Sequence, residues 1–141
     1  MTTEAELYQR MKPWIKKIGY PVRLENAVHS GLPDMFLITQ GHVLFMELKV
    51  AKSNILRFQK WQYSVGHEMM KHIHPHAHLI IVDTLELTKV ITFKEAVRGG
   101  MQAVGDVLHV DVRGLVPYAY FTDEASFVKV MKRIIGEMSY A

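Results

Sequence analysis

Three ionisable residues, Asp34, Glu47 and Lys49, lie where a β-hairpin would bring them together. Residues 34–49 form two short apolar segments joined by Gln40-Gly41, a pattern that favours a hairpin with a two-residue turn. In that register Asp34 lies directly opposite Glu47, with the two Cβ atoms about 5 Å apart on one face. Lys49 projects from the same face, because strand side chains two residues apart point the same way.

Two carboxylates placed in this way repel each other, and a divalent cation between them removes the conflict. Mg²⁺ prefers oxygen ligands and typically takes one or two carboxylates together with water and substrate phosphate. A lysine beside such an ion can assist the attacking water or stabilise charge on a phosphate. The alternative is an Asp in a loop and an ordinary surface Glu-x-Lys ion pair. The order Pro33-Asp34, apolar strand, tight turn and Glu-x-Lys is the more specific pattern, and we predict a metal-dependent site.

Two helices are expected to add side chains to this site. In a helix over residues 4–18, Glu4 falls on the apolar face, where a carboxylate needs a partner. In a second helix, which Ser53 or Asn54 would cap and which runs to about Lys71, Gln59 falls on the apolar face. The alternatives are that Glu4 lies in an exposed first turn and that Gln59 is a half-exposed glutamine, with Gln62 as its replacement.

Basic residues cluster in two segments of a chain whose net charge is only +3. Residues 7–24 contain five basic residues and no acid, and residues 49–71 contain five with one acid. Such segments are typical of a surface that faces a polyanion, although they also fit two solvated helix faces. The predicted nucleic-acid contacts are Arg10, Lys16, Lys52, Arg57 and Lys60.

The 141 residues fit one domain, and the absence of cysteine excludes a disulfide framework or a thiolate metal site. The sequence shows neither a signal peptide nor an apolar stretch of membrane-spanning length, so we expect a soluble, cytoplasmic protein. Residues 72–78 carry four histidines at alternate positions. A zinc site there is disfavoured, because Pro75 interrupts the segment and no nearby acid completes a ligand set.

The elements expected to position the site follow the order α-β-β-β-α-β over residues 3–83, an α/β arrangement in which a sheet is covered on both sides. The predicted strands are 21–25, the two arms of the hairpin, and 78–83. Residues 84–141 are read as an extension with strands near 89–93 and 106–112 and a final helix from about Asp123 to Met138, capped by Thr122. The apolar residues of 84–121 have no obvious place in this sheet, and we interpret them as a possible dimer interface.

The segments Ser30–Phe36, Phe45–Lys49 and Leu56–Trp61 together resemble the PD-(D/E)XK nuclease superfamily, and more narrowly its virus-type replication-repair nuclease (VRR-NUC) domains, including stand-alone phage ones. The resemblance covers roughly residues 3–83. It implies a restriction-endonuclease-like αβββαβ core with a central mixed sheet flanked by helices. It also implies that Asp34, Glu47 and the Leu48 carbonyl bind Mg²⁺ or Mn²⁺.

By the same resemblance Lys49 is catalytic, Glu4 is the carboxylate of the first helix, and Gln59 has a supporting role. The expected activity is Mg²⁺-dependent endonucleolytic hydrolysis of DNA, selective for branched DNA such as four-way (Holliday) junctions, in repair or recombination. The expected assembly is a homodimer, with no small organic cofactor and no membrane. The alternatives are a restriction-like or RNA-directed nuclease, and a catalytically silent nucleic-acid-binding or subunit-interaction module of the same fold.

Overall fold

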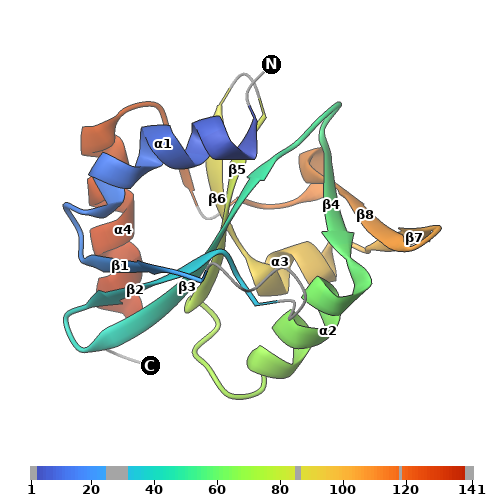
Figure 1. Cartoon of the computed structure of the whole chain (residues 1–141), viewed down its shortest axis with the longest axis horizontal. Helices are drawn as coiled ribbons and strands as arrows, with labels where there is room; N and C mark the ends of the chain where they lie inside the picture. The colour runs from blue at the N-terminus through green and yellow to red at the C-terminus, as the bar shows by residue number, and fades with distance from the viewer. Residues whose placement is uncertain (1–2, 25–31, 85–86, 118, 139–141) are drawn as a thin grey trace.

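A six-stranded mixed sheet forms the centre of the computed structural model, which describes residues 3–24, 32–84, 87–117 and 119–138 (Figure 1). In chain order the elements are α1 (Glu4–Ile15), β1 (Tyr20–Arg23), β2 (Met35–Thr39), β3 (His42–Val50), β4 (Ile55–Gln59), α2 (Lys60–Met69), β5 (His78–Asp83), β6 (Thr88–Thr92), α3 (Phe93–Arg98), β7 (Gln102–Val104), β8 (Val107–Asp111), the 3₁₀ turn η2 (Val112–Gly114), β9 (Ala119–Phe121) and α4 (Glu124–Met138). No helix in these described ranges is long and apolar enough to span a bilayer.

The main sheet has the order β1-β2-β3-β5-β6-β9, and β4, β8 and β7 form a smaller sheet. Only β3 and β5 pair in parallel in the main sheet, and its other neighbours are antiparallel. Helices α1 and α4 cover one face and share one apolar core with it, whereas α3 and the small sheet pack on the other face around a second core. The predicted class, a central mixed sheet flanked by helices, is confirmed.

The first helix is capped as expected and is shorter than predicted. The Thr3 hydroxyl accepts a hydrogen bond from the Glu6 N–H at 3.1 Å, and the helix passes through exposed Pro13. It ends at Ile15, and the chain then turns toward β2. Gly19 permits that approach, because a Cβ there would lie 2.6 Å from the Ile38 carbonyl oxygen.

The predicted helix over residues 54–71 is wrong in its first third. Residues 55–59 form β4, which pairs antiparallel with β8, and the helix begins at Lys60. Ser53 and Asn54 do not cap a helix; both adopt positive φ angles, 53° and 63°, in the turn from β3 into β4. The burial of Leu56 and Phe58 between exposed neighbours has the period of a strand rather than that of a helix.

The segment 84–121 contributes to both cores instead of lying outside them. Strands β6 and β9 extend the main sheet, and β7 and β8 complete the small one. Seven of its apolar residues are covered within the chain, namely Val90, Ile91, Phe93, Val110, Val112, Leu115 and Phe121, whereas Val104, Val116 and Tyr120 are exposed. The two cores therefore account for part of its apolar content, and its role as a dimer interface stays a prediction.

The last helix begins one residue later than expected. The Asp123 carboxylate accepts a hydrogen bond from the Ser126 N–H at 2.8 Å, so Asp123 rather than Thr122 caps it.

Candidate active site

The hairpin of β2 and β3 has the predicted register. Thr39 pairs with His42, and Met35 pairs with Met46. Gln40 and Gly41 have φ angles of 48° and 79°, which is the left-handed conformation that a two-residue turn of this kind requires. Asp34 directly precedes β2, and its Oδ2 accepts a hydrogen bond from the Leu48 N–H at 2.8 Å. The predicted juxtaposition of Asp34 with the Glu47 region of β3 is therefore present.

Glu47 is a buried carboxylate, 2 % exposed, and neither Oε1 nor Oε2 has a hydrogen-bond partner. The nearest basic atom is Nε2 of His78, 3.7 Å from Oε1. An ionised carboxylate without hydrogen bonds is costly to bury unless a positive charge compensates it. This is the environment expected of a residue that binds a cation.

Asp34 and Glu4, unlike Glu47, are exposed residues, so Glu4 lies in the exposed first turn of α1, as the alternative expected. Desolvation of its carboxyl nevertheless raises the pKa of Asp34; the Leu48 N–H opposes this shift, and the charge of Glu47 adds to it. Desolvation also raises the pKa of Glu4, where Lys49 opposes the shift and Asp34 and Glu47 add to it. The three carboxylates and Lys49 thus act on one another electrostatically.

The Lys49 ammonium group is held by two acceptors. It donates to the Arg57 carbonyl at 2.9 Å and to Gln62 Oε1 at 3.3 Å, and it lies over the Phe58 ring, 4.9 Å from its centre. An ammonium group has three hydrogens, so one donor remains for a substrate.

Gln62, rather than Gln59, is the glutamine that supports this lysine. Gln59 is the exposed last residue of β4, and its N–H donates to Gln62 Oε1 at 2.9 Å. The helical phase that favoured Gln59 assumed that residues 55–59 belong to the helix. A helix that begins at Lys60 brings Gln62 inward instead.

The donor set fits a hard divalent cation. Within the described ranges no three His, Asp or Glu side chains converge closely enough to bind a metal by themselves. Asp34 and Glu47 would supply two carboxylate ligands. A backbone carbonyl, water and a substrate phosphate would supply the remaining ligands, a mixture that Mg²⁺ and Mn²⁺ commonly accept. The participation of the Leu48 carbonyl stays a prediction.

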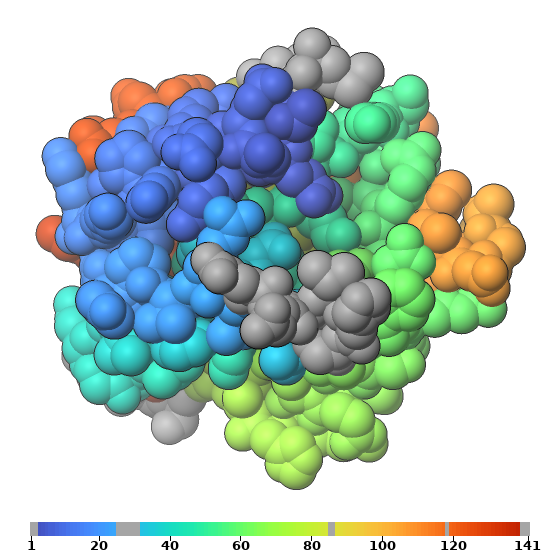
Figure 2. Space-filling view, in the orientation of Figure 1, coloured from blue at the N-terminus to red at the C-terminus, as the bar shows by residue number. Residues whose placement is uncertain are grey.

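Two of the five predicted nucleic-acid contacts lie near this site. Lys52 lies close enough to oppose the rise in the pKa of Glu4 that desolvation causes, and Arg57 is the β4 residue whose carbonyl binds Lys49. Lys60, the first residue of α2, lies 3.9 Å from Asp106. All three are exposed. Figure 2 shows atoms of β2 and β3 (cyan) between α1 (blue) and the segment of β4 and α2 (green).

Arg10 and Lys16 are placed differently. The Arg10 guanidinium donates to Thr88 Oγ1 at 3.2 Å and lies 3.6 Å from the buried Asp83 carboxylate, so it ties α1 to the main sheet. Lys16 follows the far end of α1, about 18 Å along the axis from Glu4 at 1.5 Å per residue. The structure does not bring these two residues to the carboxylates.

Two residues near the site were not singled out as site residues from the sequence. Desolvation raises the pKa of Asp34 and the charge of Arg23 opposes this rise; the Arg23 guanidinium also lies over the Tyr8 ring, 4.2 Å from its centre. His78 belongs to the histidine series, which the structure separates. Its ring is buried beside Glu47, whereas the His74 Nδ1 accepts a hydrogen bond from the His76 N–H at 3.0 Å. Alternate spacing would place these histidines on one side of a strand. Of the four, however, only His78 lies in β5, and the sequence did not indicate its partner.

No protein-family model matches the sequence, and no curated protein is significantly similar to it. Among solved structures the chain is similar to Hjc, a Holliday junction resolvase of the archaeal hyperthermophile Archaeoglobus fulgidus, with a TM-score of 0.53 and 10 % sequence identity. The similarity covers 82 % of this chain and 92 % of that one. At this identity it demonstrates a shared fold, the restriction-endonuclease-like arrangement that the sequence resemblance implied.

Proposed function

We propose that this chain is a divalent-metal-dependent DNA endonuclease that acts on branched DNA. The observation that carries the proposal is the buried Glu47 carboxylate, without hydrogen bonds, beside Asp34 and Lys49 on a hairpin of predicted register. The fold shared with an archaeal Holliday junction resolvase supports the same reaction class and suggests the branched substrate. The narrower VRR-NUC membership rests on the sequence segments alone.

In this proposal each side chain has a separate role in phosphodiester hydrolysis. Asp34 and Glu47 would hold the metal, which supplies an activated water and stabilises charge at phosphorus. Lys49, fixed by Gln62 and the Arg57 carbonyl, directs its remaining N–H toward the phosphate. Lys52, Arg57 and Lys60 contact neighbouring phosphates without reading sequence.

A panel of labelled substrates tests the proposal. The purified chain is incubated with single-stranded, duplex, flapped and four-way DNA and with RNA, in Mg²⁺, Mn²⁺ or EDTA. We expect cleavage of the four-way junction that exceeds cleavage of plain duplex under matched salt, and none in EDTA. Equal cleavage of plain duplex would indicate a general or restriction-like endonuclease. Preferred cleavage of RNA would indicate that the substrate is RNA rather than DNA. Binding without cleavage of any substrate would favour the silent module.

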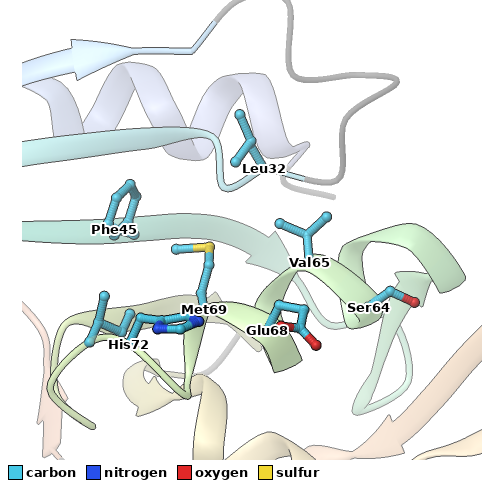
Figure 3. Close-up of a pocket in the computed structure, with 8 residues that line it drawn as sticks. Leu32, Phe45, Ser64, Val65, Glu68, Met69 and His72 are labelled. Atoms are coloured by element: carbon cyan, nitrogen blue, oxygen red, sulfur yellow. The ribbon is translucent and has the colours of Figure 1, made fainter.

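The assembly proposed for this function is a homodimer, because a four-way junction presents two equivalent strands for paired cuts. An exposed apolar row supports it: Tyr20, Ile38 and Val43 are register partners across β1, β2 and β3 and are 68 %, 44 % and 44 % exposed. This row continues along β3 to Phe45, which lines an apolar pocket of about 570 Å³ with Val65 and Met69 of α2 (Figure 3). We therefore propose this face, rather than residues 84–121, as the dimer interface.

Sedimentation at micromolar concentration tests this face. The wild-type chain should sediment as a dimer, and Val43→Lys should sediment as a monomer with an unchanged circular dichroism spectrum. The matched control is Val104→Lys, since Val104 is also exposed, at 55 %, on β7 of the other sheet. A wild-type monomer at all concentrations would reject the dimer.

A further inference from the structure

A second buried polar group lies behind the site that Asp34 and Glu47 form. His78, the first residue of β5, is 2 % exposed, and neither of its ring nitrogens has a hydrogen-bond partner. Its Nε2 faces Glu47 Oε1 at 3.7 Å, so two buried groups that both lack hydrogen bonds stand next to each other. Each group offsets the cost of burying the other, whereas removal of either one leaves an uncompensated partner.

The orientation of the imidazole is fixed by stacking. The His78 and Phe93 rings are parallel, with an interplanar angle of 1° and centres 4.7 Å apart. Phe93 begins α3 and is fully buried, and α2 approaches it at Gly66, where a Cβ would collide with the ring. The close packing of α2 on Phe93 therefore holds the imidazole in one plane.

The same aromatic residues also support the catalytic lysine. Phe93 meets Phe58 edge to face at 89°, with ring centres 6.1 Å apart, and Lys49 lies over the Phe58 ring. One pair of phenylalanines thus lies beneath both His78 and Lys49. His78, which faces Glu47, and Phe58, which lies under Lys49, therefore both pack against Phe93.

We propose that His78 is a positioning residue of the nuclease site: its Nε2–H holds Oε1 of Glu47 and leaves Oε2 free to bind the cation. A separation of 3.7 Å becomes a hydrogen bond when the two atoms approach by less than about 1 Å. The inference rests on the proposed function, in which Glu47 binds the metal. Residues that orient metal-binding side chains typically change metal affinity or activity by 10- to 100-fold when they are replaced.

Substitution of His78 separates positioning from packing. His78→Phe keeps a ring on Phe93 but removes the donor, and His78→Gln restores a donor without the ring. We expect Mn²⁺ affinity, measured calorimetrically without DNA, to fall at least about tenfold in His78→Phe. His78→Gln should recover part of the loss, and exposed His72→Phe should bind Mn²⁺ as the wild type does. In cleavage assays kcat should fall in His78→Phe while KM for DNA stays within about twofold. A folded His78→Phe protein with wild-type Mn²⁺ affinity would overturn the inference.

Nitrogen NMR of the intact chain tests the contact even if His78→Phe does not fold. The His78 Nε2 resonance should move when Mg²⁺ is added and in Glu47→Gln, and should stay in place in Glu4→Gln. An unchanged resonance in Glu47→Gln overturns the inference. Neither measurement requires cleavage, so the two proposals can fail separately. If the contact is present but no nucleic acid is cut, only the proposed nuclease function is rejected. If the protein cuts normally without the contact, only the proposed role of His78 is rejected.

Discussion

At Asp34, desolvation and the nearby charge of Glu47 both disfavour the ionised carboxyl, whereas one backbone N–H favours it. Glu47 lies deeper and has no hydrogen bond at all. Residues placed in this way reduce the stability of the metal-free protein and are expected where a site is built for a ligand. In the proposed site a bound cation would remove this cost and so link folding to metal at this position.

The raised pKa of Asp34 predicts a pH dependence of stability with a definite sign. In EDTA the folded protein holds the Asp34 proton above its ordinary pKa of 3.8, so the free energy of unfolding falls as the pH rises from 3.8 through the raised value. Asp34→Asn should remove this fall and be more stable than wild type at neutral pH. Denaturant titrations between pH 3.5 and pH 7, roughly the range in which carboxyl groups titrate, measure the difference. Exposed Glu6→Gln is the control, and a wild type that gains stability relative to Asp34→Asn as the pH rises would contradict the assignment.

At the scale of elements, the sequence predicts most reliably what neighbouring residues determine. The hairpin register follows from a local turn, and β5 follows from an unbroken apolar segment, so both were predicted correctly. Strand β4 pairs with β8, about fifty residues later, and that pairing overrides the helical pattern of residues 55–59. The wrong helix start led to the wrong glutamine, because α2 begins at Lys60 and brings Gln62 to Lys49. The contact between Glu47 and His78 also depends on the parallel pairing of β3 with β5, which no local pattern reveals.

Two glutamine substitutions test the boundary between β4 and α2. Gln62→Ala removes an acceptor of the Lys49 ammonium group and should lower kcat about tenfold, the loss typical of a supporting side chain. Gln59→Ala keeps the backbone N–H that binds Gln62 and should leave kcat within about twofold of wild type. Steady-state cleavage of the preferred substrate compares them. The opposite ranking would return the supporting role to Gln59.

At the scale of the whole molecule, the hairpin strands lie between α1 and the segment of β4 and α2, and the basic residues Arg57 and Lys60 of that segment are exposed. Sequence composition indicates how many basic residues there are, but only the fold distinguishes those beside the carboxylates from those elsewhere. Lys52 and Arg57 lie near the site, whereas Lys16 lies at the far end of α1. The two basic segments therefore differ in their expected contribution to binding.

This difference predicts distinct salt dependences. Lys52→Ala and Arg57→Ala should each weaken binding to any DNA sequence about equally and reduce the slope of log affinity against log salt by roughly one unit. Lys16→Ala, an exposed lysine remote from the carboxylates, should leave the slope unchanged. Fluorescence anisotropy in EDTA across a range of salt concentrations measures all three. If Lys52→Ala and Arg57→Ala kept the wild-type slope, as Lys16→Ala should, DNA would not lie along β4.

The central claim is that Glu47, held beside Asp34 and Lys49, makes this chain a metal-dependent nuclease. The most direct test is the single-turnover rate of four-way-junction cleavage in Mg²⁺ for wild type and Glu47→Gln, purified in parallel. We expect cleavage by wild type, and a rate at least about a thousandfold lower for Glu47→Gln, as for the loss of a group that acts directly in the reaction. Junction binding in EDTA should be equal for the two proteins. Equal cleavage rates for the two preparations would assign the activity to a contaminant or another site and contradict the proposed role of Glu47.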